Sequence, residues 1–169
     1  MPRYLTGLSF LLLAVIAPPL SFAANHEKGV RPNIAISVFE VDKGAEIPED
    51  LVGKLKEELP RRLTDTKKFN RIFTTQDFPE NQSVPTLRLT GTIVAYDSGN
   101  RAERYLVGFG AGAARLVAHI RFTNSATGRT VFERDVTGKI RGGMYGGSSS
   151  GVADQLAKEI ARVVKSESF

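Results

Sequence analysis

One segment of this sequence has the residue types and spacing of a chemical motif, and it reads VGFGAGAA from Val107 to Ala114. Gly108, Gly110 and Ala113 fit the pattern G-x-G-x-x-A, a tolerated form of the fingerprint that binds dinucleotides. The fingerprint works where a helix follows, because the phosphate then lies at the N-terminus of that helix. The residues that follow here alternate as in a strand. We therefore expect a turn or bulge where the backbone bends or closely approaches another group, and no bound cofactor.

Arginines flank this segment, with Arg101 and Arg104 before it and Arg115 after it. A guanidinium group can hold a phosphate or carboxylate through two hydrogen bonds, although arginines in loops are commonly solvated. Ordering three glycines loses more chain entropy than a plain turn requires. We therefore predict a contact with a partner, either a neighbouring copy or another protein; the rival explanation is that the glycines make room for a helix packed on the sheet. The candidate contact residues are Arg101, Arg104, Gly108, Phe109, Gly110 and Gly112.

Other residues that could carry catalysis or hold a metal are scattered. His26 and His119 are the only histidines, and neither belongs to a group with the spacing of a three- or four-ligand metal site. His119 stands in an alternating strand pattern, so we expect an ordinary surface residue. The chain has no cysteine, which excludes thiolate chemistry, disulfides and a lipid-carrying cysteine. We expect no catalytic residue and no metal site, and thus no enzyme.

The charge balance is mildly basic, at +5 for the whole chain. The basic residues are spread along the sequence, which is typical of a solvated surface and does not indicate nucleic-acid binding. Two other functions stay open beside a protein-binding one. The first is a binder of a small or polymeric anionic ligand that uses the arginines near the glycine segment. The second is a hydrolase or transferase with an unrecognised site.

The N-terminus has the pattern of a secretory signal peptide over residues 1–23. Arg3 supplies the positive charge, residues 8–17 form an apolar run, and Ser21 and Ala23 are the small residues of a cleavage site. The apolar run is shorter than the ~20 residues of a membrane-spanning helix, and no second one follows. We expect a periplasmic or secreted protein without a membrane span, in which a short linker, residues 24–32, precedes one domain, residues 33–166.

Alternating and helical patterns then predict an α+β domain. We expect a mixed sheet of about five strands with two helices on one face, in the order β-α-β-β-β-β-α. The expected strands are residues 33–41, 69–74, 86–96, 116–123 and 129–141.

The first helix follows Pro48, and an internal Pro60 predicts a kink or an early end. Its apolar stripe is Leu51, Leu55, Leu59 and Leu63, and that of the last helix is Val152, Leu156, Ile160 and Val163. Ile36, Leu55, Leu89, Ile120, Phe132 and Leu156 are expected to be buried together.

The order of motifs between Leu87 and Gly128 resembles a known family. The stretch reads L-x-L-x-G-x-I-x-x-Y, then S-G-N-R-A-x-R-Y, then G-F-G-A-G-A-A, and ends in N-S-A-T-G. This resembles the bacterial envelope family known as domain of unknown function 4410, over most of residues 33–165. Many members look like lipoproteins, but this chain lacks the cysteine, so an anchor is not implied.

The order of strands and helices is also similar to that of the N-terminal domain of the Tol-Pal propeller protein, the curli-type secretion lipoprotein and the lipoprotein activators of penicillin-binding proteins. Those domains bind and assemble. The family resemblance implies a location and a fold. We expect a non-enzymatic exported envelope module for protein binding or self-assembly, because the chain has an export signal, a single domain and no catalytic set.

Overall fold

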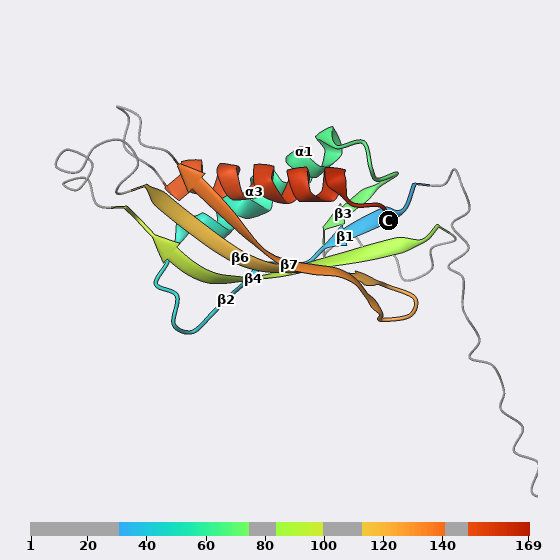
Figure 1. Cartoon of the computed structure of the whole chain (residues 1–169), viewed down its shortest axis with the longest axis horizontal. Helices are drawn as coiled ribbons and strands as arrows, with labels where there is room; N and C mark the ends of the chain where they lie inside the picture. The colour runs from blue at the N-terminus through green and yellow to red at the C-terminus, as the bar shows by residue number, and fades with distance from the viewer. Residues whose placement is uncertain (1–30, 75–83, 100–112, 141–148) are drawn as a thin grey trace, which may run out of the picture.

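The computed structural model describes residues 31–74, 84–99, 113–140 and 149–169. In this part of the chain a mixed sheet of six strands carries two helices on one face, as predicted (Figure 1). The elements follow in the order β-β-α-β-β-β-β-α, one short strand more than expected. The strands are β1 (Asn33–Ile36), β2 (Glu40–Val41), β3 (Ile72–Thr74), β4 (Thr86–Asp97), β6 (Ala114–Asn124) and β7 (Thr130–Ile140), and the helices are α1 (Asp50–Asp65) and α3 (Ser149–Ser166).

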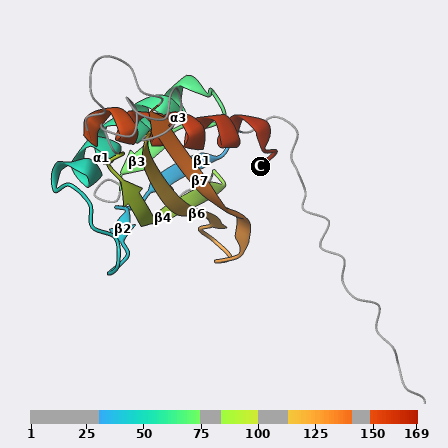
Figure 2. The same ribbon diagram turned by 60° about the vertical axis from the view of Figure 1, so that its left-hand side comes forward.

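The sheet has a parallel half and an antiparallel half. Its strands lie in the order β3-β1-β4-β6-β7, with β2 also paired to β4. Strand β1 runs parallel to both β3 and β4, whereas β4, β6 and β7 form an antiparallel meander (Figure 2). The ends of the sheet are therefore β3 on one side and β7 on the other.

The core lies between the sheet and the two helices. Alternate residues of β6, from Leu116 to Phe122, are fully buried, as the alternation predicted. They face an apolar stripe on α1 (Leu51, Leu55, Leu59 and Leu63) and one on α3 (Val152, Leu156 and Ile160). Of the six core residues predicted from the sequence, five are buried and Phe132 is partly buried against the rest. At the end of α3 the fully buried valine is Val164, not the predicted Val163, which is only partly buried.

The first strand is shorter than predicted, because the chain leaves the sheet between β1 and β2. The ring of Phe39 turns into the core there and occupies the space above Gly91. A Cβ atom at Gly91 would lie 2.2 Å from Phe39 Cε1, so only glycine admits the ring. The strand predicted over residues 33–41 is thus two strands, β1 and β2, joined by a segment that packs inward. The second predicted strand also begins later, at Ile72, since Phe69 is buried in the core.

Helix α1 continues through Pro60 to Asp65, so the predicted early end is wrong. Proline removes one backbone hydrogen bond and crowds the preceding turn. On either side of it, however, Leu59 and Leu63 are fully buried, and this packing holds the helix together. No helix in the described part of the chain is long and apolar enough to cross a membrane.

Helix α3 lies directly on strand β7. A Cβ atom at Gly138 would come within 2.4 Å of the backbone nitrogen of Leu156 and 2.7 Å of its Cα atom. The absence of a side chain at Gly138 therefore lets the backbone of α3 touch the sheet. The helix begins at Ser149.

Candidate functional site

The partner-contact residues predicted from the sequence lie outside the described residues. Arg101, Arg104, Gly108, Phe109, Gly110 and Gly112 all fall within residues 100–112, so their role stays a prediction. The structure does describe the ends between which they lie. Asp97, the last residue of β4, pairs with Arg115 at the start of β6. The chain turns there, since the amide of Gly99 donates to Asp97 Oδ1 at 2.8 Å and Gly99 has a φ of 72°.

A second glycine-rich segment leaves the sheet at the same end. Residues 141–148 follow Ile140, and Ile140 pairs with Ala114, the first residue of β6. Segments 100–112 and 141–148 are far apart in the sequence, but the described residues that flank them, Ala114 and Ile140, are paired in the sheet.

The face of the sheet opposite the helices carries a cluster of charged side chains that the sequence did not indicate. The turn at Asn124–Gly128 sets the register of β6 against β7, so that His119 pairs with Asp135 and Arg121 with Glu133. The imidazole of His119 contacts two carboxylates, with Nδ1 2.7 Å from Asp135 Oδ1 and Nε2 2.9 Å from Glu133 Oε1. Arg121 donates from Nε to Glu133 Oε2 at 2.8 Å. We call these four residues the His119 cluster.

The His119 cluster favours a protonated histidine. A neutral imidazole has one N–H and could donate to only one of the two carboxylates, whereas the imidazolium donates to both. Hydrogen bonds to Asp135 and then Glu133 raise the pKa of His119 above its ordinary value. Hydrogen bonds from Arg121 and His119 in turn lower the pKa of Glu133. With His119 protonated, the cluster holds two positive and two negative charges. Its ion pairs link β7 to β6 on the face of the sheet opposite the helices.

The His119 cluster lies at the surface. All four side chains are at least one-third exposed, and among the described residues no group of His, Asp and Glu has a geometry that could hold a metal ion. Both histidine nitrogens already have carboxylate partners, so neither is available to activate a nucleophile. The side chain of His119 is partly exposed on the face of the sheet opposite the helices. Its partners could have been found only from the register of the β6–β7 hairpin.

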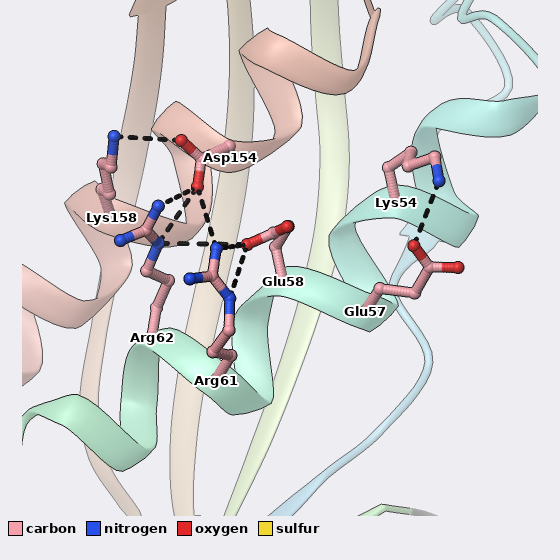
Figure 3. A network of polar contacts seen from close by, with 7 residues as sticks. All are labelled: Lys54, Glu57, Glu58, Arg61, Arg62, Asp154 and Lys158. Carbon is pink, nitrogen blue, oxygen red and sulfur yellow. Dashed lines mark hydrogen bonds and ion pairs between the residues drawn. The ribbon is translucent and has the colours of Figure 1, made fainter.

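A second polar network joins the two helices on the other side of the molecule (Figure 3). Arg62 of α1 donates through Nε to Asp154 Oδ1 of α3 at 3.0 Å, and Lys158 reaches Asp154 Oδ2 at 3.0 Å. Glu58 pairs with Arg61 on α1. Burial alone would raise the pKa of Asp154, but hydrogen bonds from Arg62 and Lys158 outweigh it and hold that pKa below its ordinary value. The network fixes α3 against α1 and is structural in character.

A small apolar cavity of about 50 Å³ lies between α1 and the segment that joins β1 to β2. Val38 and Phe39 line it on the sheet side, and Val52, Leu55 and Leu59 on the helix side. Pockets that bury a small-molecule ligand measure about 300–1,000 Å³. This cavity therefore matches one apolar side chain rather than a substrate.

Comparison with known proteins gives one family and several similar structures. A family model described as "Domain of unknown function (DUF4410)" matches residues 36–169. No curated protein matches the sequence.

Among solved structures, the PelC dodecamer from Paraburkholderia phytofirmans superposes with a TM-score of 0.55 and 13% identity, over 82% of this chain and 91% of that chain. The hypothetical protein CT253 from Chlamydia trachomatis gives 0.54 and 12%, over 80% of this chain and 96% of that one. Protein XCC0632 from Xanthomonas campestris gives 0.52 and 12%, over 80% and 84%. At identities this low, the similarity shows a shared fold and nothing about a shared function.

Proposed function

This chain belongs to the family described as domain of unknown function 4410, and from that premise we propose that it is an exported, non-enzymatic module of the bacterial envelope that assembles with further copies of itself. In this proposal the protein acts by binding other protein chains, and this binding requires no cofactor or metal. The signal-peptide pattern of residues 1–23 supports the exported part of the proposal.

The observation that carries the proposal is the two-layer build of the domain. In the described part of the chain both helices lie on one face of the sheet, so the opposite face and the outer strand β7 are turned outward (Figure 1). The outward face carries an ordered set of cross-strand ion pairs rather than a pocket. A surface of this kind can recognise another protein by shape and charge. The same fold supports a dodecamer in PelC.

Self-assembly is tested by the mass of the mature protein in solution. The full chain would be expressed with its own leader, and the exported product purified and examined by sedimentation equilibrium over a wide range of concentrations. We expect a mass that is a multiple of that of the monomer. A monomer at every concentration up to about 1 mM, where an association worth about 4 kcal/mol would be visible, refutes self-assembly.

Export is tested separately on the same material. N-terminal sequencing should show a mature chain that begins at Ala24 or within a few residues of it. A protein recovered from the producing cell that still begins at Met1 contradicts the exported part of the proposal and leaves the assembly part to the sedimentation result.

A further inference from the structure

We propose that strand β7 (Thr130–Ile140) is the surface through which two copies of this chain meet, each β7 adding antiparallel to the other around a two-fold axis at Val136. The inference rests on the self-assembly proposed above and names its contact. It follows from the position of β7 in the sheet and from the order of charges along it.

Strand β7 is the long free edge of the described sheet. The two outer strands are β3, with three residues, and β7, with eleven. Strand β7 pairs with β6 along one side, and among the described residues no other backbone group bonds to residues 131–140. An edge strand presents a row of unpaired N–H and C=O groups, which is a template for a strand of another chain.

The charges along the outward face of β7 are segregated. Glu133 and Asp135 lie in its first half, and Lys139 lies near its end. Lys139 is exposed and is paired in register with Arg115 of β6, so two cations stand side by side. No described residue forms an ion pair with Lys139. This end of β7 therefore offers a positive charge that an acid of another chain can compensate.

Antiparallel pairing around Val136 makes these charges complementary. Glu133 then lies opposite Lys139 of the partner subunit, and Lys139 opposite Glu133 of the partner subunit. Asp135 faces Thr137 of the partner subunit, whose hydroxyl group can donate a hydrogen bond to the carboxylate. On the helix side, Phe132 lies opposite Ile140 of the partner subunit, and both residues are partly buried in their own copy. Directly opposed residues in a sheet have Cβ atoms about 4.5–5.5 Å apart, which puts the side chains of each pair within reach of each other.

Registers shifted toward the start of β7 are unfavourable. An axis at Asp135 would place the two copies of that carboxylate opposite each other, and opposed like charges destabilise a sheet. An axis at Arg134 would oppose two guanidinium groups in the same way. A slip that puts the axis between two residues would bring the helix side of one strand against the open face of the other. An axis at Thr137 would instead oppose Asp135 to Lys139 of the partner subunit, so the carboxylate that is crosslinked to Lys139 distinguishes that register from the axis at Val136.

The decisive experiment is zero-length crosslinking by a carbodiimide, which joins a carboxylate to a lysine amine that it touches. Within one copy Glu133 and Lys139 lie six residues apart along an extended strand, about 20 Å at ~3.3 Å per residue. They can therefore be joined only between copies. An equal mixture of ¹⁴N- and ¹⁵N-labelled mature protein, crosslinked and digested, should yield a peptide pair that joins Glu133 of one label to Lys139 of the other.

Charge variants test the same contact without crosslinking. Lys139→Glu opposes two pairs of acids and should weaken the association measured by sedimentation roughly tenfold or more. Lys139→Gln removes the cation without introducing an acid, so it should weaken the association less than Lys139→Glu. Lys43→Glu, the same charge change at an exposed residue away from β7, should leave the association unchanged. Far-UV circular dichroism of each variant verifies that it is folded.

The outcomes separate the two proposals. An oligomer that gives no crosslink between Glu133 and Lys139, and whose affinity Lys139→Glu does not change, overturns the β7 contact and leaves self-assembly standing. A protein that is monomeric throughout overturns both. The crosslink is sought in the unmodified chain, so the test holds even where a charge variant fails to fold.

Discussion

Replacing Gly138 by alanine tests the contact between α3 and the sheet. The new Cβ atom would lie 2.4 Å from the backbone nitrogen of Leu156, about 1 Å closer than ordinary van der Waals contact. A helix backbone cannot rotate out of the way as a side chain can. Helix α3 would therefore have to move by about this distance, together with the fully buried Val152, Leu156 and Ile160.

The expected loss of stability follows from two opposing contributions. Overpacking a core costs about 1–3 kcal/mol, and the rigid obstacle places this site near the upper value. Alanine in place of glycine in a strand returns about 0.5–1 kcal/mol through the entropy of the unfolded chain. We expect a net loss of about 2 kcal/mol, which lowers the melting temperature of a domain of this size by roughly 4–8 °C.

The measurement is urea denaturation of the mature protein, followed by far-UV circular dichroism. Gly53→Ala is the matched control, because its Cβ atom meets nothing within 4 Å and it lies inside α1. Alanine there should stabilise by up to about 1 kcal/mol. The same substitution should therefore lower the free energy of unfolding at Gly138 and raise it at Gly53. A Gly138→Ala protein as stable as the parent would refute the described contact between α3 and β7.

Three further predictions concern the core and the two polar networks. Leu55→Ala and Leu156→Ala should each lower the free energy of unfolding by about 2–5 kcal/mol in the same denaturation assay, and two unchanged midpoints would mean that the buried faces of α1 and α3 are misassigned. Asp154→Asn should cost about 1 kcal/mol at neutral pH, between the values for exposed and buried pairs, whereas Glu57→Gln on the exposed side of α1 should cost almost nothing. Because the folded-state pKa of Asp154 is lowered, its contribution exists above the ordinary carboxyl pKa and disappears as the pH falls through the lowered value, so parent and variant should converge in acid. The pKa of His119 is raised, so the stability from its cluster is complete below the ordinary histidine pKa and is lost as the pH rises through the raised value; an NMR titration should show the raised pKa in the parent and a lower one in Asp135→Asn, and equal values would contradict the described contacts.

The parts of the fold that were predicted from the sequence are those with a regular apolar period. Leu51 to Leu63 repeat every four residues and Leu116 to Phe122 alternate, and both sets are buried as expected. The predictions that were wrong share a different cause. Phe39 breaks β1 from β2 because Gly91, far away in the sequence, leaves room for its ring, and α1 passes Pro60 because buried leucines hold it on both sides. Both outcomes depend on contacts between distant segments, which no local pattern records.

The His119 cluster was out of reach for a related reason. His119, Glu133 and Asp135 look unremarkable along the chain, and they meet only because the hairpin turn sets one register out of several. A shift by one residue would have separated them across the sheet. The glycine segment, in contrast, was singled out by its composition, and the structure fixes the strand ends that flank it.

The mixed sheet also has a consequence for the order in which the protein can fold. The meander of β4, β6 and β7 pairs strands that are neighbours in sequence. Strand β1, in contrast, pairs with β4, and the contact between Ile34 and Leu87 closes a long stretch of chain that contains β2, α1 and β3. Closing that loop costs entropy before any contact compensates it, so distant parallel pairings form late. A chain that emerges on the far side of a membrane from its N-terminus would present Ile34 and Ile36 first and bury them last. In the exported protein proposed above, we therefore expect the N-terminal strand to be the part that depends most on protection from aggregation during folding.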